Sequence, residues 1–396
     1  MAEEAAHKPG STRALVALLA FVLGFATVPH RVMERDAAKW FEGDAAQTDL
    51  LAAGVARWTE SPDALAPATF ATGSSRFDGE WLFATFMMSA MGFGQVATAR
   101  TGAARDESVA RMERCLDALL EPRVRTFEDQ AWGNDALASL DATPGSAEDR
   151  GHVAYLGYAG LALSLHRTLR PASRFVAREE AIARAIARRI EASPTGFVET
   201  YPGEVYPVDN TAALAALALH ARATGEPPPP ALERGLAAVS RSGVDPATGL
   251  LVQAVTVGDA APRDAPRASG TALAAYFLSF ADDATSRALF HALEKHQYRT
   301  VIGFGGMMEY PPGKRAARGD VDSGPVFLGF GVSASGFALG ASRVHGDRET
   351  FTALYATAQL FGAPLEQDGT LTYATGGPIG DAILFAMLTA PRRRPS

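Results

Sequence analysis

Two kinds of helical segment alternate along the chain. The first is uncharged and rich in alanine, as in NTAALAALALHA from Asn210. The second carries charges on one face and apolar residues at i, i+3 and i+4, as in SRFVAREEAIARAIARRI from Ser173. A helix that is apolar all round must be surrounded by protein, whereas a striped helix covers a surface. The pattern therefore predicts inner and outer helices in alternation.

The uncharged segments recur at a long period. Their starts are separated by about 70, 59, 59, 55 and 53 residues, which indicates repeated helical hairpins. With residues 35–58 as the sixth outer helix, the pattern predicts an all-α fold, a closed (α/α)6 toroid of six inner and six outer helices. Closure removes the exposed ends that an open solenoid has to cap. The inner segments start at Trp81, Gly151, Asn210, Ser269, Gly324 and Gly377.

Few segments have the pattern of a strand. Residues 249–257 (GLLVQAVTV) and 370–374 (TLTYA) do, and we expect short hairpins there at a rim. A chain of 396 residues can form one large closed architecture. We therefore expect residues 31–390 to form one barrel domain and residues 391–396 to be a solvated basic tail.

The N-terminus has a separate character. Lys8 and Arg13 precede an uncharged apolar run from Ala14 to Val28, which is typical of a signal peptide or a short membrane anchor. No small-residue cleavage site follows, so residues 1–30 favour an uncleaved anchor and an inner-membrane or exported location. The alternative is a buried helix of the main domain.

The composition limits the classes of function and of site that the chain can have. Hydrophobic residues make up 47% and charged residues 20% of the chain, as in ordered globular proteins. A net charge of −7 argues against nucleic acid as a partner. The single cysteine, Cys115, excludes an internal disulfide and a cysteine-based metal cage, and its amphipathic surroundings predict a packed thiol. We expect no metal and no cofactor.

Polar residues concentrate just ahead of the uncharged segments. In a closed ring the loops that enter the inner helices converge on one mouth. Carboxylates in a partly apolar basin acquire separated pKa values, so that one is a base and another an acid. This arrangement suits proton transfer to a hydroxyl or glycosidic oxygen. The candidate catalytic residues are Asp209, Glu204, Asp322 and His152, and the candidate substrate-binding residues are Asp78, Trp81, Tyr155, Tyr158, Thr200, Tyr201, Tyr206, Asn210, Glu309, Tyr310, Asp320 and Tyr373.

Each leading candidate also has a structural interpretation. Asp209 stands where Asp is a favoured helix N-cap. Glu204 lies in a loop with several prolines, where its side chain could simply be solvated. His152 could bond a backbone group at a helix start. Asp320 and Asp322 have the spacing of a calcium loop without its later Gly and Glu. GFGG at Gly303 lacks the context of a dinucleotide motif and is interpreted as a turn.

Two segments resemble a known family. YLGYAGLALSLHRTL and, about forty residues later, GFVETYPGEVYPVDNTAALAALAL are similar to the linalool dehydratase/isomerase-like family over about a third of the chain. The resemblance implies an (α/α)6 barrel and a lyase or isomerase. Aligning Asn210 with the asparagine of the family's motif puts Asp209 and Thr200 at its two cysteine positions. Since both cysteines are absent, the resemblance implies the place of the pocket, with Asp209 in proton transfer.

Three functions stay open at this point. The first is an acid–base lyase, isomerase or dehydratase that acts on a small hydroxyl-bearing substrate near the membrane. The second is a carbohydrate-active glycoside hydrolase or polysaccharide lyase. The third is a non-catalytic toroid that binds a glycan or a partner chain. A fold alone does not separate these classes.

Overall fold

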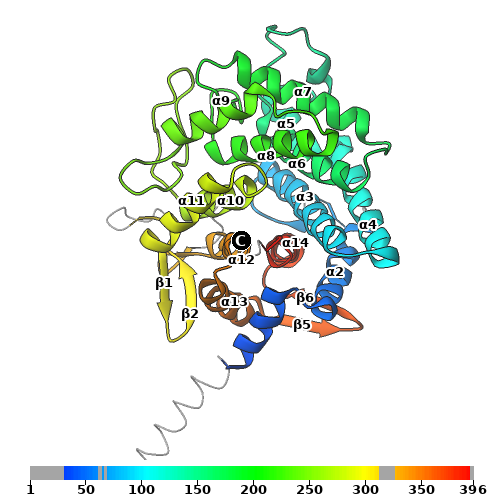
Figure 1. The fold of residues 1–396 in the computed structure, drawn as a ribbon, viewed down its shortest axis with the longest axis vertical. Helices are drawn as coiled ribbons and strands as arrows, with labels where there is room; N and C mark the ends of the chain where they lie inside the picture. Colours follow the sequence, from blue (N-terminus) through cyan, green and yellow to red (C-terminus); the bar gives the residue numbers. More distant parts are fainter. Residues whose placement is uncertain (1–30, 61–64, 67–68, 312–325, 393–396) are drawn as a thin grey trace, which may run out of the picture.

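Six helices line the centre of the part of the chain that the computed structural model describes, which is residues 31–60, 65–66, 69–311 and 326–392. Each of the six packs on the next along the chain, and α14 packs on α3, which closes the ring (Figure 1). The inner helices are α3 (Ser75–Ala99), α6 (Val153–Leu169), α8 (Pro207–Thr224), α10 (Ala268–Leu278), α12 (Val332–His345) and α14 (Gly377–Leu388).

A second layer of helices surrounds the first. Along the chain, one outer helix that packs on the inner layer separates each pair of successive inner helices. An additional helix, α5 (Pro122–Trp132), lies between α4 and α6 in the sequence. The predicted all-α toroid is therefore confirmed. The outer helices are α2 (Ala45–Thr59), α4 (Gly102–Leu120), α7 (Val176–Ala192), α9 (Pro230–Ala238), α11 (Asp283–His296) and α13 (Arg348–Gly362), with short turns η3 (Ala138–Asp141) and η4 (Val239–Gly243).

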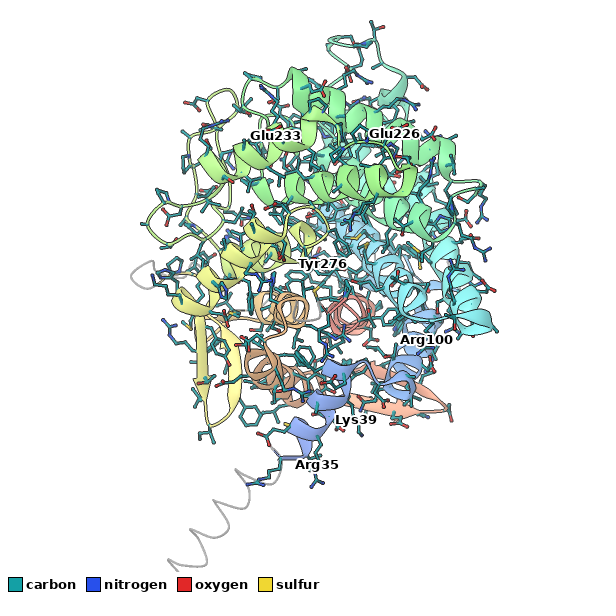
Figure 2. The ribbon with its side chains drawn as sticks, viewed as in Figure 1. Arg35, Lys39, Arg100, Glu226, Glu233 and Tyr276 are labelled. Atoms are coloured by element: carbon teal, nitrogen blue, oxygen red, sulfur yellow. The ribbon has the colours of Figure 1, made fainter. Side chains whose placement is uncertain are left out.

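Small residues and one polar link hold the inner helices together. A Cβ added at Gly92 would collide with the Phe385 ring, so α3 and α14 approach closely only because this residue is glycine. Tyr276, near the centre of Figure 2, donates from its hydroxyl to Gln95 Oε1 at 3.0 Å. Gln95 Nε2 in turn donates to the Ala386 carbonyl oxygen at 2.8 Å. These bonds satisfy buried polar groups and tie α3, α10 and α14.

The described strands form three antiparallel hairpins. They pair β1 (Tyr298–Val301) with β2 (Phe304–Met307), β3 (Val326–Phe327) with β4 (Phe330–Gly331), and β5 (Pro364–Gln367) with β6 (Thr370–Tyr373). The predicted strand at 370–374 is β6. The turn interpretation of GFGG holds only for Gly303, which forms the β1–β2 turn with Ile302, both at positive φ, whereas the next three residues belong to β2.

Three segment predictions need correction. Residues 249–257 form only isolated bridges, because Val255 pairs with Val205 and Pro262 in place of a continuous partner strand. The uncharged segment from Gly324 becomes helical only at Val332, since β3 and β4 precede it. The predicted outer helix 35–58 is interrupted at Gly43, whose φ of +80° ends a first helical stretch at residues 31–42.

The first helical stretch, residues 31–42, is hydrogen-bonded to Arg343 at the C-terminal end of α12, and Arg343 also bonds the segment after α14. Trp40 is buried, and Arg343 Nε at the end of α12 donates to its carbonyl oxygen at 3.2 Å. Arg343 also donates to the Ala390 carbonyl oxygen after α14. The expected anchor, residues 1–30, lies outside the described residues. Of the described helices, α3 is long and apolar enough to cross a membrane, and it is mostly buried inside the ring.

A buried carboxylate joins α6, α7 and α8. Glu179 accepts a hydrogen bond from Ser164 Oγ at 2.7 Å and lies 2.8 Å from His220 Nδ1. This bond to Glu179 raises the pKa of His220 above its usual value. Protonated His220 therefore stabilises the fold fully below about pH 6.5, and this contribution is lost as the pH rises through the raised pKa.

We expect His220→Gln to remove this pH dependence. Between pH 6 and 9 the thermal midpoint of the wild type should fall relative to that of the variant, by differential scanning calorimetry. Parallel curves for the two proteins over this range would contradict the assignment.

Candidate active site

Asp209 lies in the first turn of α8, at the entrance to the ring. Its Oδ1 accepts a hydrogen bond from the Tyr158 hydroxyl at 2.7 Å, and its Oδ2 accepts one from Thr200 Oγ1 at 2.9 Å. Tyr206 is the capping residue and Pro207 begins the helix, so the N-cap interpretation of Asp209 is wrong. With 9% exposure, Asp209 is a nearly buried carboxylate held by two hydroxyl donors.

The loop before α8 is fixed by the next side chain, Asn210. Its Oδ1 accepts from the Val198 amide at 2.8 Å, and its Nδ2 donates to the Val198 carbonyl at 3.1 Å. Thr200 Oγ1 accepts from the Tyr206 amide at 3.1 Å. Asn210 therefore holds the loop that presents Thr200 to Asp209, which is a different role from the expected substrate contact.

A second carboxylate, Glu128 of α5, is fully buried. Neither of its oxygens has a hydrogen-bond partner among the described residues. His152 Nδ1 lies 3.3 Å from Glu128 Oε1, and the His152 ring lies on Trp132 with ring centroids 4.7 Å apart. Trp132 Nε1 donates to the Thr200 carbonyl at 3.3 Å. A chain of contacts through His152, Trp132 and Thr200 therefore connects Glu128 with Asp209.

Sequence reasoning missed Glu128. It lies in a striped segment, where a charge is expected to face solvent. Val124 and Phe127, however, mark the buried face of α5. Glu128 lies on this face, because it follows Val124 by four residues and Phe127 by one. A carboxylate on the apolar stripe of an amphipathic helix was the available signal.

The first turns of α3 contribute a third group. The Arg76 guanidinium lies 3.7 Å above the Tyr201 ring, and the Tyr201 hydroxyl donates to Glu80 Oε2 at 3.4 Å. Glu204 accepts from the Tyr206 hydroxyl at 3.1 Å. Arg76 and Glu80 were not among the predicted site residues. We call the whole set the mouth cluster: Arg76, Glu80, Glu128, His152, Tyr158, Thr200, Tyr201, Glu204, Tyr206 and Asp209.

Burial and nearby charges shift the pKa values of three side chains in the mouth cluster. Burial raises the pKa of Glu128 well above its usual value, and the nearby charges of Asp209 and Glu80 act in the same direction. Both effects favour the protonated, neutral form of Glu128. Burial, with the Arg189 charge, lowers the pKa of His152 to about 3, so the imidazole is neutral. Burial and then Asp209 raise the pKa of Tyr158, which stays a phenol donor.

Several predicted residues lie outside the mouth cluster. The Tyr155 hydroxyl donates to the Leu119 carbonyl at 2.8 Å inside the core, and Tyr373 is buried against Asp381, which accepts from its amide at 2.6 Å. Asp78 accepts from the Thr72 amide and hydroxyl at 2.8 and 2.7 Å. These side chains support the fold and its loops, because their polar groups are used locally.

The remaining candidates belong to other parts of the ring. Trp81 packs edge-on against Phe70, with ring centroids 6.2 Å apart. Glu309 accepts from Ser269 Oγ at 2.6 Å at the start of α10, and the guanidinium of Arg267 lies 5.5 Å from the Tyr310 ring. Asp320 and Asp322 lie outside the described residues, so their predicted roles stay predictions.

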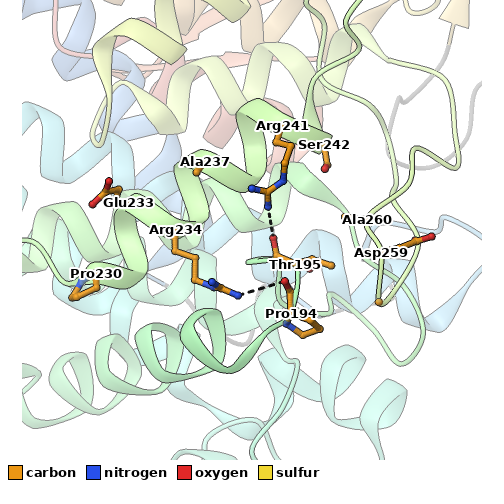
Figure 3. A pocket seen from close by; sticks show the side chains of 11 residues that line it. Pro194, Thr195, Pro230, Glu233, Arg234, Ala237, Arg241, Ser242, Asp259 and Ala260 are labelled. Atoms are coloured by element: carbon orange, nitrogen blue, oxygen red, sulfur yellow. Dashed lines mark hydrogen bonds between the residues drawn. The ribbon is translucent and has the colours of Figure 1, made fainter.

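A surface pocket of about 630 Å³ lies away from this cluster, between α9, η4 and the loop after α7 (Figure 3). In Figure 3, Arg234 and Arg241 point to the loop, where they donate to the Pro194 and Thr195 carbonyls at 3.4 and 3.2 Å. None of the pocket's lining residues belongs to the mouth cluster, and none is aromatic. The pocket's carboxylates, Glu233 and Asp259, are both exposed, whereas the mouth cluster contains buried carboxyl groups, so the mouth cluster is the better candidate for chemistry.

Neither a metal nor a thiol accompanies the described cluster. No group of three His, Cys, Asp or Glu side chains in the described ranges could hold a metal ion. Cys115 lies buried in α4, and burial raises the pKa of its thiol to about 12. The positions where the resemblance would place two cysteines hold Asp209 and Thr200, hydrogen-bonded to each other.

No family model and no curated protein matches the chain. Among solved structures it is similar to two α-mannanases of glycoside hydrolase family 76. One is from Bacteroides thetaiotaomicron, with 11% identity, coverage of 77% of this chain and 84% of that one, and a TM-score of 0.48. The other is an inactive variant of an α-1,6-mannanase from Salegentibacter sp. HEL1_6 in complex with α-1,6-mannotriose, with 10% identity, coverage of 78% and 88%, and a TM-score of 0.49.

These findings correct the expected enzyme class. The prediction of a lyase or isomerase is wrong, because the solved structures that the chain resembles are hydrolases and the described site contains no thiol for the route implied by the resemblance. The linalool dehydratase/isomerase-like resemblance is supported only as far as the toroid. The chain is an (α/α)6 barrel with two buried carboxyl groups, those of Glu128 and Asp209, in its mouth cluster.

Proposed function

We propose that the mouth cluster hydrolyses a glycosidic bond of an oligosaccharide by acid–base catalysis. The observation that carries this proposal is that two buried carboxyl groups have different surroundings. Glu128 lies in an apolar site without a hydrogen-bond partner among the described residues, whereas Asp209 accepts bonds from two hydroxyls. An acid and a carboxylate kept apart in pKa by their surroundings are what glycoside hydrolysis requires.

Each group has a defined part in the proposed reaction. Glu128 donates its proton to the glycosidic oxygen while the bond from that oxygen to the anomeric carbon breaks. The Asp209 carboxylate stabilises the positive charge that develops on the sugar ring and accepts a proton from the attacking water. Tyr158 and Thr200 hold the carboxylate in place, which saves reorganisation at the moment of reaction.

The rim of the cluster suits the hydroxyl groups of a sugar. Arg76, Glu80 and Glu204 are only partly buried, so their donors and acceptors can reach a ligand in the mouth. Tyr206 is half-buried beside Glu204 and offers an aromatic face. Sites of this kind combine apolar surface with a few placed polar groups.

The proposal is tested with Glu128→Gln. Purified protein is assayed on a panel of oligosaccharides that includes α-1,6-mannooligosaccharides, with detection of new reducing ends. We expect kcat to fall by about 10²–10⁴-fold. In the wild type, activity is lost as the pH rises through the raised pKa of Glu128, and the variant lacks this loss.

Two controls separate acid catalysis from a general loss of function. An aryl glycoside with a good leaving group needs no protonation, so the variant should keep most of its activity on it. Glu204→Gln at the rim should retain the wild-type pH profile. Equal losses of Glu128→Gln on both substrate types would contradict the acid role.

We also propose that the apolar run Ala14–Val28 anchors the chain at a membrane. This proposal rests on sequence alone. Recovery of the full-length protein in the membrane fraction, and of a variant that begins at residue 31 in the soluble fraction, would support it, whereas soluble full-length protein would contradict it.

A further inference from the structure

His152 and Glu128 form a buried pair that the proposed proton transfer leaves incomplete. The exposed fractions of the two side chains are 1% and 0%. His152 Nδ1 and both Glu128 oxygens lack hydrogen-bond partners among the described residues, although Nδ1 is only 3.3 Å from Oε1. Buried polar groups are normally satisfied, so a pair left in near contact calls for an explanation.

The backbone of His152 is held in an unfavourable conformation. Its φ is +62°, the left-handed region that residues other than glycine seldom adopt. Gly151 before it is also left-handed, and a side chain there would collide with Trp132. Arg189 donates to the Gly151 carbonyl at 3.1 Å, and the Val153 amide donates to the Glu199 carbonyl at 3.3 Å. Strain of this kind persists where the surroundings over-determine it, often at functional sites.

The strained backbone has one clear effect on the side chain. It places the imidazole between the Trp132 ring and the carboxyl group of Glu128. We propose that His152 is a positioning residue whose Nδ1–H bonds the Glu128 carboxylate after Glu128 has given its proton to the substrate. This role rests on the proposed function, in which Glu128 is the acid.

The charges around Glu128 explain why such a donor is needed. Asp129 on its own helix, Glu80 on α3 and Asp209 on α8 all disfavour the ionised form, and Arg76 on α3 is the opposing charge. A hydrogen bond to a carboxylate is roughly twice as strong as one between neutral groups. The Nδ1–H therefore stabilises the ionised form of Glu128 more than any bond between the imidazole and the protonated form.

The test measures the pKa of Glu128 directly, without a substrate. Protein labelled with ¹³C at the glutamate carboxyl carbons is titrated by NMR, and Glu128→Gln identifies the resonance. His152→Leu replaces the donor with an apolar group of similar reach, and we expect the Glu128 pKa to rise by about one pH unit. His152→Asn places Nδ2 where Nδ1 stood and tolerates a positive φ, so its Glu128 pKa should stay near the wild-type value.

The outcomes separate the role of His152 from a purely structural one. An unchanged or lower Glu128 pKa in His152→Leu would overturn the proposal, as would equal shifts in the Leu and Asn variants. If the predicted shift appears but no glycoside is cleaved, the pairing stands and the hydrolase proposal fails alone. A second variant, His152→Gly, suits the positive φ and should fold. Its hydrolysis should fall by about tenfold or more and recover in part with added imidazole, and no recovery would count against the positioning role.

Discussion

Replacement of Asp209 by Asn is expected to lower kcat/KM for glycoside hydrolysis by about 10²–10⁴-fold. The variant keeps the size of the side chain and an oxygen that can accept from Tyr158 or Thr200, but it loses the charge that stabilises the transition state. The Glu128 pKa should fall in the same variant, because the Asp209 charge raises it. Steady-state kinetics and the carboxyl NMR titration measure the two effects.

Tyr158→Phe is the matched control for this prediction. It removes one of the two hydroxyl donors to Asp209 and leaves the carboxylate charge. We expect a smaller fall in kcat/KM, of about tenfold, since the Thr200 bond remains. A Phe variant as inactive as Asp209→Asn would show that the site is lost through its structure, and wild-type kinetics in Asp209→Asn would remove this residue from the mechanism.

Replacement of Arg189 by Met is expected to give the largest loss of stability, about 3 kcal/mol in the free energy of unfolding. The buried guanidinium bonds Asp149 at 3.1 Å, the Gly151 carbonyl at 3.1 Å, and the Ser139 carbonyl at 2.9 Å. Its removal leaves these acceptors without a buried donor. It also loosens the loop that carries His152, so activity should fall as well.

Urea unfolding measures this loss, with Arg188→Met as the control. Arg188 donates to the same Asp149 from Nε and Nη2, each at 2.7 Å, but is more exposed. We therefore expect a loss of about 1 kcal/mol. Losses of equal size would indicate that only the Asp149 charge matters, and that the carbonyl bonds of Arg189 contribute little.

The toroid was predictable because its two layers leave different patterns. An inner helix such as α8 has buried residues on all sides, so it contains no charge between Asn210 and Leu219. An outer helix such as α7 alternates buried Ile182 and Ile186 with exposed charges. Hairpins were less predictable, because their strands are four residues or shorter and their register depends on contacts distant in sequence.

The candidate site was predictable only where its residues lie in the entry loops. Asp209, Thr200 and Tyr158 belong to entry loops or to the first two turns of inner helices, and connectivity brings such segments together. Glu128 comes from an extra helix outside the hairpin repeat, so its proximity to His152 depends on tertiary packing alone. Tyr155 lies about one turn before Tyr158 on α6, but its hydroxyl is used by the Leu119 carbonyl in the core, a contact that depends on the packing of α4 on α6.

Cleavage of an oligosaccharide in ¹⁸O-labelled water tests the central proposal most directly. The oligosaccharide panel is incubated with the wild-type protein and with the Asp209→Asn and Glu128→Gln variants. Mass spectrometry then measures the masses of the products. The account predicts that the wild type releases fragments with one ¹⁸O at the new reducing end, and that both variants release far less. No cleavage by folded wild-type protein, or cleavage at the same rate in both variants, would contradict it.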